Sequence, residues 1–131
     1  MTGLRVLLGL GLAASLASCA SGPVAGDLTF TLHTPNADDG AIAFRVATSA
    51  PQTIGGGTAL CTGCRIFLVS VADTEVSGIV TGPLRSGAIF SLTVSDTRTP
   101  SAYTGTVLDA ASGTFVERGP AGYHITASQD P

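Results

Sequence analysis

Apolar and polar residues alternate along several short stretches of the chain, and a period of two is the pattern of a β-strand with one buried face. In Leu28–His33 every second residue is apolar, and the residues between are threonines and a histidine. Ala41–Thr48 alternates in the same way and places Arg45 on the outward face. Both segments are therefore predicted to be half-buried strands.

Further strand-like segments are separated by turns rich in Gly, Pro, Ser and Asp, and we expect strands at Glu75–Thr81, Ala88–Val94, Tyr103–Leu108 and Gly122–Ser128. Ser49–Gly57, which ends in three consecutive glycines, is predicted to be a loop and the most flexible segment. Asp109–Glu117 fits either a short helical turn or an irregular crossing between strands.

The segment Arg65–Val71 differs because it is apolar on both faces apart from Ser70. Continuous apolar runs are typical of strands that are covered on both sides. We therefore expect a central strand with Phe67 in the core, where truncation to alanine would cost about 3 to 5 kcal/mol. A surface strand would instead expose one apolar face to water, as a patch where a partner docks.

The number and spacing of these segments predict an all-β domain, an antiparallel β-sandwich of about seven or eight strands. A small closed β-barrel is the alternative. The stretch VTGPLRSGAIFSLTVSD, residues 80–96, resembles the Gly-rich turn and following strand of cohesin-like sandwiches, which are immunoglobulin-like in the loose sense. That resemblance covers a small part of the chain and implies the sandwich fold only, because no partner-binding residue matches.

The N-terminus carries the features of a secretory signal. Arg5 precedes an apolar run from Val6 to Ala17, which is too short to span a bilayer because a membrane helix needs roughly 20 residues. The sequence LASC at residues 16–19 then resembles the lipobox of bacterial lipoproteins. Ordinary secretion, with cleavage after Ala20, is the alternative.

The lipobox resemblance implies that Cys19 is acylated and becomes the first residue of the mature protein. Ala20 stands where an aspartate would favour retention in the inner membrane. The resemblance therefore implies the outer membrane, with a secreted protein as the alternative. The predicted organisation is a lipoprotein signal peptide at 1–18, a lipidated cysteine with a flexible tether at 19–26, and one β-sandwich domain at 27–131.

Charge and composition exclude several classes of function. Six basic and nine acidic residues are scattered along the chain, with a net charge of −3, and no basic patch is present to bind nucleic acid. The chain contains no G-x-S-x-G motif, and without lysine a Ser-Lys mechanism is impossible. No catalytic residue and no cofactor are predicted.

Cys61 and Cys64 form the motif CTGC, for which several chemistries are open. A c-type haem hook needs a histidine where Arg65 stands, and structural zinc usually needs four thiolate or imidazole ligands. A thioredoxin-like redox pair sits at the start of a helix, whereas a strand-like run follows here. A disulfide across a β-turn fits best, because residues i and i+3 of such a turn have Cα atoms within about 7 Å.

Two smaller groups of residues are also candidate sites. Asn36, Asp38 and Asp39 supply oxygen atoms within a short segment and are candidate calcium ligands, although an Asp-Gly pair also favours a hairpin turn. His33 and His124 are expected to face solvent, and they would meet only if the first and last strands pair.

The sequence predicts a lipid-anchored, non-enzymatic module of the cell envelope with a structural or protein-interaction role. Its expected partners are the membrane, through the lipid, and an envelope protein or glycan. A carbohydrate- or small-ligand-binding module is the first alternative, and an envelope enzyme or thiol redox protein is the second. Tyr103 and Tyr123, the only tyrosines, are expected to cap the core with their hydroxyls at its edge.

Overall fold

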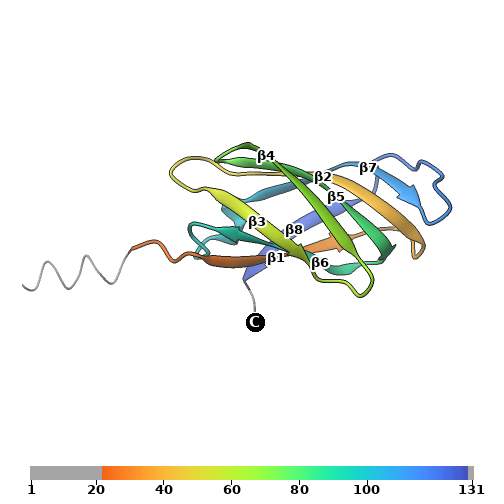
Figure 1. The fold of residues 1–131 in the computed structure, drawn as a ribbon, viewed down its shortest axis with the longest axis horizontal. Coiled ribbons are helices and arrows are strands. Elements are labelled where there is room, and N and C mark those ends of the chain that lie inside the picture. The colour runs from red at the N-terminus through yellow and green to blue at the C-terminus, as the bar shows by residue number, and fades with distance from the viewer. Residues whose placement is uncertain (1–21, 130–131) are drawn as a thin grey trace, which may run out of the picture.

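The computed structural model describes residues 22–129, which form two four-stranded antiparallel sheets packed face to face (Figure 1). Sheet A has the strand order β3-β6-β1-β8 and comprises β1 (Gly26–His33), β3 (Ile54–Ala59), β6 (Gly87–Val94) and β8 (His124–Gln129). Sheet B has the order β4-β5-β2-β7 and comprises β2 (Asp39–Ala47), β4 (Arg65–Ala72), β5 (Glu75–Leu84) and β7 (Thr104–Ser112). The predicted antiparallel sandwich is confirmed, and the barrel alternative is wrong because the two sheets do not close on each other.

The core lies between the sheets and is built from the alternating residues of the strands. The inward residues of β1 and β2 are fully buried, as the alternation predicts: Leu28, Phe30, Leu32, Ile42, Phe44 and Val46. Phe90 of β6 links the two layers, because its ring stacks on Phe30 of its own sheet at 5.0 Å and on Phe44 of the opposite sheet at 4.3 Å. This stack of three aromatic rings is the centre of the hydrophobic core.

The segment Asp109–Glu117, for which the sequence fits two alternatives, is partly strand and partly loop in the structure. Strand β7 continues through it to Ser112, and a loop then leads to β8. Strand β5 likewise continues past the glycine and proline where the sequence suggested a turn, and ends at Leu84. The predicted strands are therefore confirmed in identity but are longer than expected at these ends.

The prediction of a flexible loop at Ser49–Gly57 is wrong in its second half, because β3 begins at Ile54 and pairs with β6. Its glycines permit a close approach between these strands. A Cβ atom on Gly57 would lie 2.2 Å from the carbonyl oxygen of Ser91, so only glycine fits there. The glycine run serves strand packing at that point rather than mobility.

The prediction that Arg65–Val71 is a buried central strand is also wrong. Strand β4 lies at the edge of sheet B and pairs with β5 alone. Its alternate residues Ile66 and Leu68 pack against the core, but Phe67, Val69 and Val71 are 59, 66 and 57 % exposed. An apolar run fits a strand covered on both sides, but here no second layer covers the outer face.

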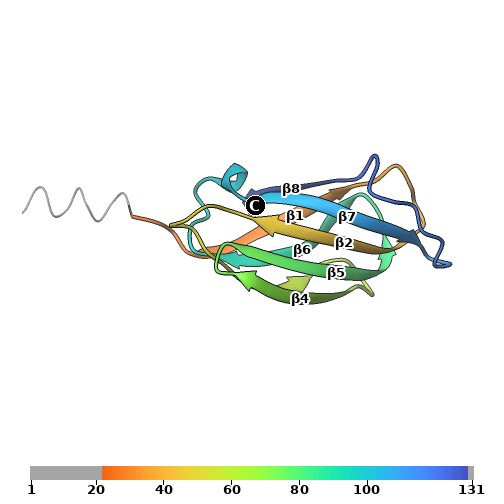
Figure 2. The same cartoon turned by 90° about the horizontal axis from the view of Figure 1, so that it is seen from above.

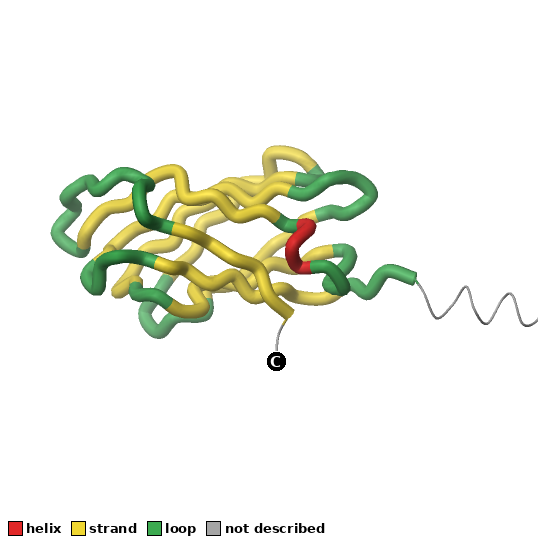
Figure 3. Tube along the Cα trace, turned by 180° about the vertical axis from the view of Figure 1, so that it is seen from behind, coloured by secondary structure: helices red, strands yellow, loops and turns green. Residues whose placement is uncertain are grey.

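The strands run lengthwise, so the loops gather at two ends of the sandwich (Figures 1 and 2). The chain enters at one end, here called the tether end, which also carries loops 48–53, 73–74 and 95–103. Figure 3 shows the short 3-10 helix η1 (Pro100–Ala102) beside the entering chain. The opposite end, here called the distal end, carries loops 34–38, 60–64, 85–86 and 113–123. Within residues 22–129, no helix has the length and hydrophobicity to cross a bilayer.

Candidate functional site

The CTGC motif forms a disulfide-closed turn at the distal end. Cys61 and Cys64 are bonded with their Cα atoms 5.4 Å apart, and the Cys64 N–H donates to the Cys61 carbonyl at 3.1 Å. Gly63 is the third residue of this turn and has a φ of 76°, a positive value that favours glycine at that position of a β-turn. The predicted disulfide turn is confirmed. It joins β3 of one sheet to β4 of the other, and a strand rather than a helix follows it.

A buried carboxylate holds the other distal loops together. Asp39, the first residue of β2, is 1 % exposed and accepts hydrogen bonds from the Thr34 hydroxyl, from the Tyr123 hydroxyl at 2.7 Å and from Arg118 Nη1 at 2.8 Å. The Asn36 side-chain amide donates to the same Tyr123 hydroxyl at 2.8 Å. This network connects the loop before β2 to the loop before β8.

The candidate calcium ligands Asn36, Asp38 and Asp39 already have partners within the protein. Arg118 Nη1 lies 2.8 Å from a carboxylate oxygen of Asp38 as well as from Asp39. Its hydrogen bond is the main reason that the pKa of Asp38 lies below its usual value, and the pKa of Arg118 is raised in return. The positively charged guanidinium of Arg118 thus lies beside the two carboxylates, at the place where they would attract a calcium ion. Among residues 22–129, no three His, Cys, Asp or Glu side chains gather to hold a metal ion.

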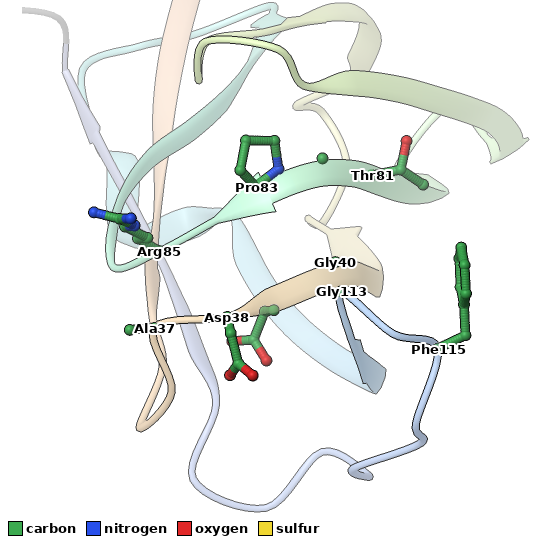
Figure 4. Close-up of a pocket in the computed structure, with 10 residues that line it drawn as sticks. Ala37, Asp38, Gly40, Thr81, Pro83, Arg85, Gly113 and Phe115 are labelled. Carbon is green, nitrogen blue, oxygen red and sulfur yellow. The ribbon is translucent and has the colours of Figure 1, made fainter.

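A pocket of about 510 Å³ opens beside this network at the distal end (Figure 4). It lies where β2 and β5 change register near Gly40, and Thr81, Arg85 and Phe115 line its walls. Phe115 is 89 % exposed and has a φ of 65°, a conformation that is strained for a large side chain. Such strain is found at ligand-binding sites, so the pocket is one candidate binding site.

The second candidate is the outer surface of sheet B at its β4 edge. We call it the β4 face and define it as Phe67, Val69, Val71 and Ile79. Ile79 of β5 lies directly opposite Phe67 in the strand register and is 45 % exposed. A contiguous group of large apolar side chains on a surface is the usual mark of an interaction site, whereas single exposed apolar residues are ordinary.

The two histidines are brought together. Strand β1 pairs with β8, and His33 lies directly opposite His124, as expected if the first and last strands pair. Both side chains are exposed, and His33 Nε2 lies 3.3 Å from the Thr126 hydroxyl. The pair lies on the outer face of sheet A, opposite in direction to the buried Leu32, and neither histidine lines the pocket.

The tyrosine prediction is confirmed. Tyr103 and Tyr123 are both buried. The Tyr103 hydroxyl donates to the Asp96 carbonyl at 2.9 Å, and the Tyr123 hydroxyl belongs to the Asp39 network. Both rings therefore close the core while their hydroxyls reach polar partners at its edge.

Two residues of these sites had no signal in the sequence. Arg118 meets Asp39 across 79 positions of the chain, and no local pattern encodes so distant an ion pair. Phe115 lies in the segment Asp109–Glu117, whose sequence fits either a helical turn or an irregular crossing, and its left-handed backbone is unusual for its residue type. Cys19, the predicted lipidation site, lies outside the described residues.

No protein-family model, curated protein or solved structure matches the chain.

Proposed function

We propose that the protein is a non-enzymatic module of the cell envelope, anchored through a lipid on Cys19 and binding another protein through the β4 face. The anchor rests on the lipobox resemblance at residues 16–19. The binding role rests on one observation above all: Phe67, Val69 and Val71 are each more than half exposed on a strand whose outer edge is unpaired within residues 22–129.

Edge strands normally carry features that prevent association, such as lysine, proline or inward-pointing charge. Between Arg65 and Asp73, β4 has no charged residue and no proline. An extended partner segment can add to such an edge through main-chain hydrogen bonds, and exposed side chains then supply specificity. The part of β4 from Ile66 to Ser70 therefore has the properties of a strand-addition site, and the register shift against β5 between Ser70 and Ala72 marks where the regular edge ends.

The polar groups at the distal end support a binding role over an enzymatic one. Asp39, Arg118 and Tyr123 bond to one another and brace the loops that carry them. A general acid or base would need to reach a substrate proton. Here the carboxylate oxygens are already satisfied by protein donors, so the network is suited to fixing structure.

A photo-crosslinking residue placed at Phe67 in the full-length protein tests the binding role in the native envelope. The matched control is Leu108, which is 45 % exposed on β7, at the opposite edge of the same sheet. We expect a discrete protein adduct at position 67 and none at 108. Absence of any adduct at 67, or equal adducts at both positions, contradicts the proposal.

The anchor has a separate test. Replacing Cys19→Ala removes the thiol to which the lipid would be attached, so lipid labelling is expected to stop and lipoprotein-type processing to be blocked. Membrane fractionation of the unaltered protein should place it in the outer membrane. A parent protein that partitions into the aqueous phase of a detergent separation, with a mature N-terminus beyond Cys19, contradicts lipidation.

The distal pocket favours one second candidate, binding of a glycan of the envelope. Phe115 offers a flat, exposed ring, and Thr81 and Arg85, which also line the pocket, supply hydrogen-bonding groups. Binding to immobilised envelope glycans should then be lost in Phe115→Ala and kept in Leu108→Ala. A parent protein that binds none of these glycans excludes this candidate without affecting the β4 face.

A further inference from the structure

We propose that the partner of the β4 face is a second copy of this chain, with the two β4 strands paired antiparallel about a twofold axis at Val69. The inference rests on the proposed function and names the partner. A twofold arrangement needs a surface that is complementary to itself. Strand β4 meets this condition in its backbone, its apolar side chains and its flanking charges.

The backbone of β4 has one free edge. The carbonyl oxygen of Phe67 turns toward β5, since a Cβ atom on Gly78 would lie 2.7 Å from it. Main-chain groups alternate between the two edges along an antiparallel strand, so Ile66, Leu68 and Ser70 turn theirs to the outer edge. From Ile66 to Ser70 a second β4 strand would find donors and acceptors there at the spacing of an ordinary sheet; beyond Ser70 the pairing of β4 with β5 shifts register before Ala72.

Charge fixes the register of this pairing. Arg65 and Asp73 flank the apolar stretch, both are exposed, and neither belongs to an ion pair found within residues 22–129. With the axis at Val69, Arg65 at the start of β4 in each copy comes next to Asp73 of the other, in the turn that directly follows β4. Complementary charges of this kind set orientation and register more than affinity.

Neighbouring registers are less favourable. Moving the axis to Leu68 would place Arg65 opposite Val71, and moving it to Ser70 would place Phe67 opposite Asp73. Only the axis at Val69 brings apolar side chains together while pairing the charges. Phe67 then lies beside Val71 of the second copy, and Val69 lies beside its own equivalent.

The pairing also orients the domains on a membrane. Because the two β4 strands run in opposite directions, the tether ends of the two copies lie at opposite ends of the pair. If both copies are anchored in one membrane through Cys19, their long axes must lie along its surface. Strand β1 begins at Gly26, and Val24 is bonded to Asp96 and Thr97. The part of the predicted tether from Cys19 to Pro23 therefore has to reach the membrane from each end, at no more than about 3.6 Å per residue.

Disulfide trapping tests the register in the full-length protein in its native envelope. In Val69→Cys the two introduced thiols face each other across the axis, with Cβ atoms about 5 Å apart, and a covalent dimer is expected on a non-reducing gel. In Phe67→Cys the introduced thiols lie four positions apart, at about 13 Å, so no dimer is expected. Co-expressing Phe67→Cys with Val71→Cys should restore the crosslink between the two variants.

Charge reversal provides the second arm, measured as the yield of the Val69→Cys dimer. Arg65→Asp or Asp73→Arg alone places like charges opposite each other, and loss of the crosslink is expected. The combined reversal should restore it. The unaltered protein is the control, because its Cys61–Cys64 pair is already bonded and should give no covalent dimer.

Absence of a dimer in Val69→Cys overturns the proposal, and so does a dimer of equal yield in Phe67→Cys, which would show random collision. Failure of the combined charge reversal to restore the crosslink overturns the register. These results are separable from the proposed function. A protein adduct at position 67 without self-crosslinking would leave the interaction role standing and identify a different partner.

Discussion

Strands β4 and β6 have similar sequences and opposite environments. RIFLVSVA forms β4 and GAIFSLTV forms β6, and each places an Ile-Phe pair near its start. Phe90 of β6 is fully buried in the aromatic stack, whereas Phe67 of β4 is mostly exposed. Strand β6 lies between β3 and β1, whereas β4 has β5 alone as its neighbour. An apolar run therefore does not determine whether a strand is central; its neighbours do.

The largest expected effect comes from truncating the two phenylalanines in parallel. Phe90→Ala removes the ring that joins both sheets and should lower the free energy of unfolding by about 3 to 5 kcal/mol. Phe67→Ala should lower it by about 1 kcal/mol or less, because that ring is already in water. Denaturant unfolding of both variants measures the difference, and equal losses would contradict the assignment of β4 to the surface.

The close approach of β3 to β6 is the next contrast. A Cβ atom on Gly57 would clash with the Ser91 carbonyl, whereas one on Gly56 would meet no atom within 4 Å. Gly57→Ala should therefore destabilise the fold by about 1 to 3 kcal/mol, and Gly56→Ala should change it by no more than about 0.5 kcal/mol. Thermal unfolding distinguishes them. Similar midpoints for the two variants would mean that β3 does not pack on β6 as described.

The disulfide turn that leads into β4 should have a modest effect. Replacing both Cys61 and Cys64 with Ser releases a very short loop, for which the chain-entropy relation gives no more than about 2 kcal/mol. We expect the double variant to keep its fold, as judged by circular dichroism and denaturant unfolding. Insulin reduction that is present in the parent and lost in the variant would instead identify a thiol redox site.

The smallest effect concerns the end of β6, where a carboxylate side chain holds the chain, whereas the turn after β4 is held by backbone hydrogen bonds from Ile54 and Thr48. Asp96, just beyond β6, accepts hydrogen bonds from Arg98 and from the Val24 amide. These bonds, with Arg98 first, lower the pKa of Asp96 from its ordinary 3.8. Folding therefore favours the ionised form, and the resulting stability is present above about pH 4 and lost as pH falls through the lowered pKa.

Asp96→Asn should accordingly reduce stability slightly at pH 7, and its difference from the parent should shrink as the pH falls toward 2. Unfolding curves at several pH values measure this difference. The matched control is Glu117→Gln, an exposed carboxylate in the loop before β8 that belongs to none of the ion pairs found within residues 22–129. A pH-independent difference for Asp96→Asn would contradict the role of its charge.

Local patterns predicted the fold where one face of a strand is polar. Strict alternation in β1 and β2 identifies Leu28 and Phe44 as core residues, since only one face of each strand can be buried. The same reasoning failed for Phe67 because both faces of β4 are apolar. It failed for Ile54 because the following glycines resemble a loop, and their role depends on β6, which lies far away in the sequence.

The candidate sites were predictable only in part. Cys61 and Cys64 are close in sequence, so their spacing was enough to predict the disulfide turn. Asp39 is a candidate calcium ligand in the sequence, together with Asn36 and Asp38, but its ion-pair partner, Arg118, is distant in the chain. The β4 face arises from the absence of a covering layer, which no residue pattern within β4 records.

Hydrogen exchange most directly tests whether the β4 face is an interaction surface while β6 is core. The full-length protein is compared in dilute detergent solution and in native envelope vesicles. Amides of β6 should be protected in both. Those of Ile66, Leu68 and Ser70, which turn to the free edge of β4, should exchange rapidly in dilute solution and slowly in the envelope. Rapid exchange of these three amides in both conditions would contradict the interaction role of β4.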